Sequence, residues 1–480
     1  MLFNTPLFIL LFLPITLLGY FLLQHTLKKA TPAKIFLVLA SLFFYGYWKK
    51  EYLFLITGSI LFNYFLGVLL LKNKNKSILI LGISLNLLLI GIFKYTDFVI
   101  QNMNRVTSNA LPLLNLMLPL AISFFTFQQI AFLVDSYKGN VRHTNFLDYT
   151  LFITFFPQLI AGPIVSHSEM TPQFLDANNR KISSVNTARG IFIFSLGLFK
   201  KVIIADTFAL WANAGFGDVN LDFFSAWQTS LSYTFQLYFD FSGYSDMAIG
   251  LALLFNIHLP INFNSPYKAL NIQDFWRRWH MTLSRFLSTY VYIPLGGNRQ
   301  GKYRTYVNLT ITFLLGGIWH GAGWTFIIWG LLHGLALVMH RMWRQWNIRM
   351  PNIIAWLLTF GFINGAWVFF RANNVREAMT LFKGMLGLNG FGNMQSNIET
   401  LIDFILSNSF SINTSLTIPI ITIYIFSALL IILKMKNSQE QLIQFTTNYR
   451  TLFLASMSFL IAFLALLSDN NVSDFLYFNF

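Results

Sequence analysis

Two histidines, His320 and His333, lie in a stretch that is otherwise apolar and rich in glycine, LLGGIWHGAGWTFIIWGLLHG from Leu314. An ionisable side chain at membrane depth is rare and usually functional. Four glycines flank His320, and small residues let helix backbones approach closely. We expect this packing to fix the imidazole and burial to keep it neutral, as a general base requires. A structural histidine, bonded to a carbonyl of the next helix, is the alternative. His333 and His340 share one helix face, and no role is assigned to either.

A second stretch, DFWRRWHMTLSRF at residues 274–286, combines aromatic and basic side chains. On a helical wheel of about 100° per residue, one face is apolar and the other carries Arg277, Arg278, His280, Ser284 and Arg285. The pattern predicts a re-entrant or interfacial helix near residues 274–290, with its basic face toward a wet funnel and His280 kept neutral by the arginines. A helix on the membrane surface, with its arginines at lipid phosphates, has the same pattern.

Two further motifs contain side chains that could take part in chemistry. Asp240 and Asp246, in YFDFSGYSDMAIG, would act as an acid and base pair or would neutralise nearby arginines. In the terminal FLYFNF, Tyr477 offers a hydroxyl for covalent relay, although an aromatic belt at the membrane interface has the same composition. No His, Asp or Glu cluster has metal-ligand spacing. Without cysteine, thiolate sites and disulfides are excluded.

The elements that position these residues are predicted to be membrane helices. The 480 residues are 55% hydrophobic and 11% charged, and apolar runs recur with nearly the ~20 residues that a spanning helix needs. These runs cover residues 6–23, 53–71, 78–93, 111–134, 191–205, 353–370, 418–433 and 452–467. We predict an all-α polytopic membrane protein with roughly eleven to thirteen transmembrane or re-entrant helices. Residues 1–469 form one membrane domain, and residues 470–480 form a periplasmic aromatic tail. The break in FFPQLIAGPI, at residues 155–164, implies buried backbone beside an interior cavity.

The positive charge is expected to set the topology. The net charge is +15, and Lys and Arg gather in short loops, as in HTLKKATPAK, KNKNK and SYKGNVRH, which the positive-inside rule places in the cytoplasm beside anionic lipids. TDFVIQNMN, from Thr96, is poor in these residues and is expected outside. Both termini are therefore predicted to be periplasmic. Nucleic acid is not an expected partner, because the charge is distributed among these loops.

The motifs FWRRWHMTLS, LGGNRQG, FFPQLIAGPI and QLYFDFSGYSDMAIGLALL, together with the stretch around His320, resemble the membrane-bound O-acyltransferase (MBOAT) family. They are most similar to its bacterial branch of alginate O-acetylases and peptidoglycan O-acetyltransferases. The resemblance implies a helical bundle around a central tunnel and transfer of an acetyl group from cytoplasmic acetyl-CoA across the inner membrane. The acceptor would be a cell-envelope polysaccharide, with peptidoglycan slightly favoured over alginate-like exopolysaccharide. A periplasmic acetyltransferase partner would finish the transfer.

The resemblance also assigns residues. The histidine of the Trp-His-Gly motif, His320, would be catalytic, and His280 would line the same tunnel. Phe475, Tyr477 and Phe480 match a terminal Phe-x-Tyr-x-x-Phe pattern whose tyrosine carries the acyl group. The remaining candidates for the tunnel or the donor site are Arg277, Arg278, Arg285, Trp319, Asp240 and Asp246. Neither a metal nor a tightly bound cofactor is implied.

Other functions are compatible with buried polar residues around a cavity. A transporter or flippase of an acyl carrier or lipid-linked sugar is the main alternative. A lipid-linked glycosyltransferase and a non-catalytic acyl-channel scaffold are further ones. A transporter differs from the enzyme in a testable way. In a transporter, replacing His320 would abolish translocation but would not affect any chemical step.

Overall fold

The structure is a computed structural model that describes residues 1–107, 110–141, 144–392, 418–468 and 475–476. All regular elements in these ranges are helical. In the first half they are η1 (Phe8–Phe12), α1 (Leu13–Leu27), α2 (Ala30–Gly46), α3 (Tyr52–Lys72), α4 (Lys76–Ile90), η2 (Gly91–Tyr95), α5 (Thr96–Thr107), α6 (Ile122–Lys138), α7 (Phe146–Thr154), α8 (Phe156–Leu159), α9 (His167–Leu175), η3 (Ala177–Arg180), α10 (Ser184–Phe199), η4 (Lys200–Ala205), α11 (Asp206–Phe216) and α12 (Phe223–Leu254).

The second half contains η5 (Pro266–Lys268), α13 (Ile272–Trp276), α14 (Met281–Leu287), η6 (Ser288–Tyr292), α15 (Gly301–His320), α16 (Trp324–Trp343), η7 (Arg344–Trp346), α17 (Asn352–Arg371), α18 (Val375–Met385), α20 (Ile418–Lys434), α21 (Ser438–Ile443) and α22 (Tyr449–Ser468). Within the described ranges, six helices are long and apolar enough to cross a membrane, judged by length and composition. They confirm a multi-pass, all-helical membrane protein.

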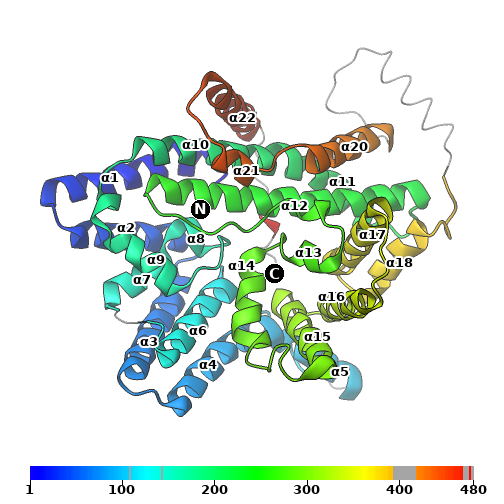
Figure 1. Ribbon diagram of the computed structural model, residues 1–480, viewed down its shortest axis with the longest axis horizontal. Coiled ribbons are helices and arrows are strands. Elements are labelled where there is room, and N and C mark those ends of the chain that lie inside the picture. Colours follow the sequence, from blue (N-terminus) through cyan, green and yellow to red (C-terminus); the bar gives the residue numbers. More distant parts are fainter. Residues whose placement is uncertain (108–109, 142–143, 393–417, 469–474, 477–480) are drawn as a thin grey trace.

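Helix α12 runs through the middle of the molecule (Figure 1). Every residue from Ser232 to Leu254 is buried, as expected of a helix enclosed on all sides. It packs against α10, α11, α17, α18 and α20. The contact with α10 is made by backbone, because a Cβ on Gly197 would meet the Gly243 carbonyl oxygen at 2.6 Å and one on Gly250 would meet the Gly190 oxygen at 2.7 Å. Such close contact is typical of helices that associate without a hydrophobic driving force.

Polar side chains hold the helices beside this core together. The Asn86 amide donates to Asn63 Oδ1 (2.6 Å), and the Asn63 amide donates to Gln129 Oε1 (3.0 Å). These bonds join α4, α3 and α6, in the region at the lower left of Figure 1. Hydrogen bonds of this kind stabilise helix pairs in lipid by about 0.6 kcal/mol on average.

Two sequence-based predictions need correction, and a third is confirmed. The apolar run 111–134 is not one helix, because α6 begins only at Ile122; Pro112 and Pro119 precede it, and proline disfavours helix continuation. The segment from Thr96 is helical rather than a loop. The break at residues 155–164 is buried, as predicted.

Candidate active site

His320 is the last residue of α15, and its backbone is held by the turn η2. Lys94 Nζ donates to the carbonyl oxygens of Trp319 (2.6 Å) and His320 (2.9 Å), and the Tyr95 hydroxyl donates to that of Ile318. The last carbonyl groups of a helix have no partner within the helix, and a cation there also complements the helix dipole. The π-helical geometry of η2 is of a kind often found at functional sites. These bonds fix the position of the His320 backbone.

Glycines bring α16 directly against α15. A Cβ on Gly317 would meet the Phe326 carbonyl oxygen at 2.4 Å, and one on Gly330 would meet that of Phe313 at 2.5 Å. The connecting residues, 321–323, include two glycines with extended backbone, of which Gly323 caps α16. The glycine-rich sequence therefore produces a tight helical hairpin that carries His320 at its turn.

The His320 imidazole is surrounded by aromatic rings. It is 3% exposed, and its ring centroid lies 4.8 Å from that of Trp319 and 5.0 Å from those of Trp329 and Phe370. Trp329 also contacts His333, whose Nδ1 accepts a hydrogen bond from Trp276 Nε1 (3.2 Å). This bond makes His333 an integral part of the aromatic packing behind His320, while His340 lies in the last turn of α16.

His280 lies at a break between two short helices. The predicted continuous helix across residues 274–290 is wrong: α13 ends at Trp276, and α14 begins at Met281 after His280, whose φ is +41°. Two backbone bonds secure this turn, from Met281 N to Asn262 O (3.0 Å) and from Asn264 N to Arg278 O (2.9 Å).

The break places the His280 side chain among buried aromatic rings. Its side chain is fully buried, and its ring lies 4.8 Å from that of Phe241 and 6.3 Å from that of Trp319. His280 and His320 therefore approach the same tryptophan, Trp319. The structure thus brings together both histidines that the sequence singled out, although on a backbone that the helical wheel did not predict.

The three arginines are not gathered at the histidines. Arg277 is exposed, and Arg278 pairs with Asp274 (2.9 Å). Arg285 pairs with Glu169 (2.6 Å), and both line a cavity of about 150 Å³, termed here the Arg285 cavity, together with Asp135 and Phe286. Of the three, Arg285 is the one that this cavity could present to a ligand.

Asp240 and Asp246 neutralise lysines rather than arginines. Lys201 Nζ lies 2.8 Å from Asp240 and 2.7 Å from Asp206, and Lys200 Nζ lies 2.7 Å from Asp246. Asp246 also accepts hydrogen bonds from Ser438 and from the Gln439 amide, at the start of α21. Both carboxylates are buried in these pairs. Each of the two carboxylates therefore forms an ion pair with a lysine, where an arginine was expected.

Three lysines of this region, Lys94, Lys200 and Lys201, are not among the residues that the sequence motifs indicated. Lys200 and Lys201 lie inside the apolar run 191–205, and Lys94 directly follows the run 78–93. A lysine within or beside an apolar membrane segment is the same signal that drew attention to the histidines. Applied to every charged residue, this signal would have found all three.

A second cavity, of about 540 Å³, is lined in part by residues that follow His320 in the chain. We term it the Asp206 cavity. Its lining is largely polar and includes Lys201, Asp206, Gln236, Asp240, Arg371 and Asn373, with the Phe370 ring that contacts His320. Ala322 and Gly323, which follow His320 in the chain, complete the wall nearest to it.

Aromatic rings connect the two cavities. Phe286, in the wall of the Arg285 cavity, stacks on Phe127 at 4.1 Å, and Phe127 stacks on Trp319 at 5.0 Å. Trp319 and His320 then lead to Phe370 at the Asp206 cavity. His320 thus stands within a row of rings that has a cavity at each end.

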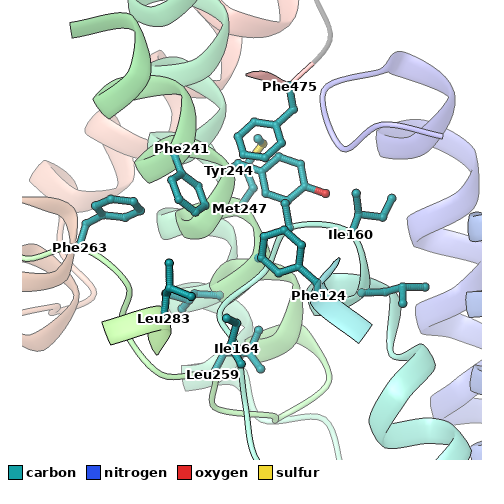
Figure 2. Close-up of a cluster of buried hydrophobic side chains, with 14 of the residues drawn as sticks. Phe124, Ile160, Ile164, Phe241, Tyr244, Met247, Leu259, Phe263, Leu283 and Phe475 are labelled. Atoms are coloured by element: carbon teal, nitrogen blue, oxygen red, sulfur yellow. The ribbon is translucent and has the colours of Figure 1, made fainter. Parts of the chain in front are cut away.

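The C-terminal tail enters this region. Phe475 is 1% exposed and stacks on Tyr244 at 4.4 Å, and it contacts Phe241 at 5.7 Å (Figure 2). Leu476 N donates to Asp240 Oδ2 (2.9 Å), and its side chain lines the Asp206 cavity. Phe475 therefore lies in the protein core rather than in an aromatic belt facing lipid. Tyr477 and Phe480 lie outside the described residues.

The chain is similar to a family model and to several known proteins. Residues 101–375 match the model of the membrane-bound O-acyltransferase family. The chain is 57% identical to a peptidoglycan O-acetyltransferase of Helicobacter pylori, over 81% of this chain and 80% of the relative. It is 39% identical to the probable alginate O-acetylase AlgI of Pseudomonas aeruginosa, over 82% and 76%. A teichoic acid D-alanyltransferase of Bacillus subtilis is 29% identical over 52% and 67%. The chain belongs to the membrane-bound O-acyltransferase family.

Proposed function

We propose that this acyltransferase moves an acetyl group from cytoplasmic acetyl-CoA across the inner membrane for O-acetylation of a cell-envelope polysaccharide, with peptidoglycan favoured as the acceptor. The observation that carries the proposal is the 57% identity to a peptidoglycan O-acetyltransferase over 81% of the chain. The alginate relatives are more distant, at 37% to 40% identity, which favours peptidoglycan over alginate.

His320 acts as the general base in this proposal. Its imidazole takes the proton from the acceptor hydroxyl while the hydroxyl oxygen attacks the thioester carbonyl. The carbon–sulfur bond then breaks, the acetyl ester forms, and the proton passes to the leaving thiolate. A base held by its neighbours accelerates such a transfer by about 10² to 10⁴. The Lys94 bonds and the rings around His320 supply the rigidity that this step requires.

His280 and Trp319 form the opposite wall of the reaction site. Both are buried, and the His280 ring contacts the rings of Phe241 and Trp319. An apolar wall excludes water, which would otherwise hydrolyse the thioester. His280 adds a polar group to this wall within reach of Trp319.

In this proposal each of the two cavities opens toward one of the two substrates. The Arg285 cavity also contains Asp135, near the end of α6 and the basic segment SYKGNVRH, and therefore faces the cytoplasm if the positive-inside rule holds. Arg285 there would meet a phosphate of the donor, whereas Arg277 and Arg278 would contact headgroups or the donor from the protein surface. The Asp206 cavity lies toward α5, since Trp324 Nε1, at the start of α16, donates to Asn102 Oδ1 (3.0 Å). That side would be periplasmic and would receive the acceptor.

Tyr477 is proposed as the first acceptor of the acetyl group. Support comes from its two preceding residues: Phe475 is packed on Tyr244, and Leu476 is bonded to Asp240 in the wall of the Asp206 cavity. In this proposal residues 1–469 are the membrane domain, and the tail of residues 470–480 is periplasmic, as is the N-terminus. A periplasmic partner would take the acetyl group from the tyrosine and transfer it to the polysaccharide.

The test is a labelling experiment with the purified full-length protein and acetyl-CoA labelled in its acetyl group. Wild type, His320→Ala, Tyr477→Phe and the control His340→Ala are compared for label on the C-terminal peptide and for donor hydrolysis. We expect label on Tyr477 in the wild type and the control, and none in the other two variants. Hydrolysis that depends on His320 without label on Tyr477 would retain the base and refute the relay. Equal behaviour of all four proteins would refute the catalytic assignment.

A further inference from the structure

A large groove lies beside the end of α1. It is bounded by α1, η3, the beginning of α10 and the end of α12, and its volume is about 1050 Å³. We term it the Arg180 groove. Its wall is apolar and is lined by Leu17, Leu18, Phe21, Leu22, Ile182 and Leu254. Leu18 and Leu22 are 71% and 62% exposed, so this wall is open to the surroundings of the protein.

One end of the groove is basic. His25, Lys28, Arg180 and Lys181 lie there, and none of the described residues that line the groove is acidic. Arg180 Nε is buried and has no hydrogen-bond partner among the described residues. A buried donor without a partner is costly, which points to an acceptor that is bound at this position in the membrane. The charged side chains in the described lining are therefore all basic.

The dimensions of the groove match one leaflet of a bilayer. Helix α1 belongs to the candidate membrane span Phe8–Leu27, and Lys28 follows this span directly. From Leu17 to Lys28 the helix rises about 16 Å at ~1.5 Å per residue, which is about half of the ~30 Å hydrocarbon core. The apolar wall is thus at the depth of acyl chains, and the basic end is at the depth of headgroups.

We propose that the Arg180 groove binds one anionic phospholipid. Its phosphate accepts hydrogen bonds from Arg180 and from Lys28 or Lys181, and one acyl chain lies along Leu18 and Leu22. A zwitterionic lipid is disfavoured because no carboxylate is present to receive its ammonium group. The lipid would bridge α1 to η3 and α10. This proposal is independent of the acetyl-transfer reaction.

The test measures which lipid stays with the protein. Full-length protein is reconstituted in an equimolar mixture of phosphatidylglycerol and phosphatidylcholine, extracted into mild detergent, and examined by native mass spectrometry. The groove variant is Lys28→Gln/Arg180→Gln/Lys181→Gln. The matched control, Lys72→Gln/Lys74→Gln/Lys76→Gln, removes the same charge from another basic loop. A second groove variant, Leu18→Trp, blocks the acyl path at an exposed position and leaves the charges unchanged.

We expect the wild type and the loop control to retain phosphatidylglycerol in preference to phosphatidylcholine, and both groove variants to lose this preference. Each basic group removed should weaken retention about fivefold. Equal retention by the groove variants and the loop control would overturn the proposal. It would also be overturned if soluble glycerol phosphate displaced the lipid completely, since the site would then recognise an anion alone.

Discussion

Lys94 provides a sharp test of how His320 is positioned. Substitution of Lys94 by Met keeps most of the aliphatic stem but removes both hydrogen bonds to the carbonyl groups of Trp319 and His320, which measure 2.6 and 2.9 Å. Hydrogen bonds from charged donors contribute about 1.5–3 kcal/mol each. The substitution also removes the desolvation cost of a buried charge, which offsets part of this loss. We therefore expect a net loss of about 2 kcal/mol in the free energy of unfolding.

The effect on activity should exceed the effect on folding. The freed carbonyl groups have no partner within α15, so the end of the helix shifts and carries the His320 ring with it. A displacement of about 1 Å at a reacting group can reduce the rate about 100-fold. Lys94→Met should therefore lower kcat about 10- to 100-fold while the KM for acetyl-CoA changes little, because the Arg285 cavity is untouched.

The assay is single-turnover acetyl release from labelled acetyl-CoA, with melting temperature measured on the same samples. Tyr95→Phe removes one neutral donor, to Ile318, and should have a smaller effect in the same direction. Lys94→Arg retains a cation and should recover part of the rate. Lys72→Met, at the end of α3, is the control for loss of a lysine. A Lys94→Met enzyme with wild-type kcat, or one whose loss of rate equals its loss of folded protein, would refute the positioning role.

Two other substitutions separate the tail from the fold. Asp240→Leu removes the acceptor of Leu476 N–H and should reduce label on Tyr477 at least about tenfold. Its control Asp246→Leu breaks the comparable pair with Lys200 and should retain the label, although both variants should lose about 3–5 kcal/mol of stability. Equal labelling of the two variants would contradict the anchoring role of Asp240. Gly197→Ala places a Cβ 2.6 Å from the Gly243 carbonyl oxygen. It should reduce the free energy of unfolding by about 1–3 kcal/mol and therefore lower the melting temperature. Its control Gly361→Ala, which meets no atom within 4 Å, should be neutral or slightly stabilising, and equal melting temperatures would contradict close packing of α10 on α12.

The membrane helices could be predicted from the sequence because their cause is local. The run 353–370 became α17, and the run 452–467 became α22. In each case about twenty apolar residues without an interruption suffice, since the backbone must satisfy its own polar groups in lipid. The prediction of one helix over the run 111–134 was wrong for an equally local reason, because the run contains prolines. Residues before α6 are instead held by Asp97, which accepts from Leu114 N (2.8 Å) and Asn115 N (2.9 Å).

The site could be predicted only in part, because its geometry depends on contacts between distant segments. His320 was identified from its apolar, glycine-rich surroundings, but the lysine that supports it is more than two hundred residues earlier in the chain. The break at His280 contains neither proline nor glycine. The helical pattern of residues 274–286 therefore did not predict an interruption there. The turn is imposed by Asn262 and Asn264, which bond its backbone from another segment.

The two histidines have a structural property in common that accounts for the polar residues around them. His320 lies at a helix end and His280 lies between two helices, so both expose backbone groups that a continuous helix would satisfy. Such breaks are tolerated at membrane depth only where the protein supplies partners. Lys94 and Tyr95 supply them at His320, and the segment at Asn262 and Asn264 supplies them at His280. The positions of both imidazoles therefore depend on residues with no direct part in the chemistry, and substitutions at those residues should reduce activity through the backbone.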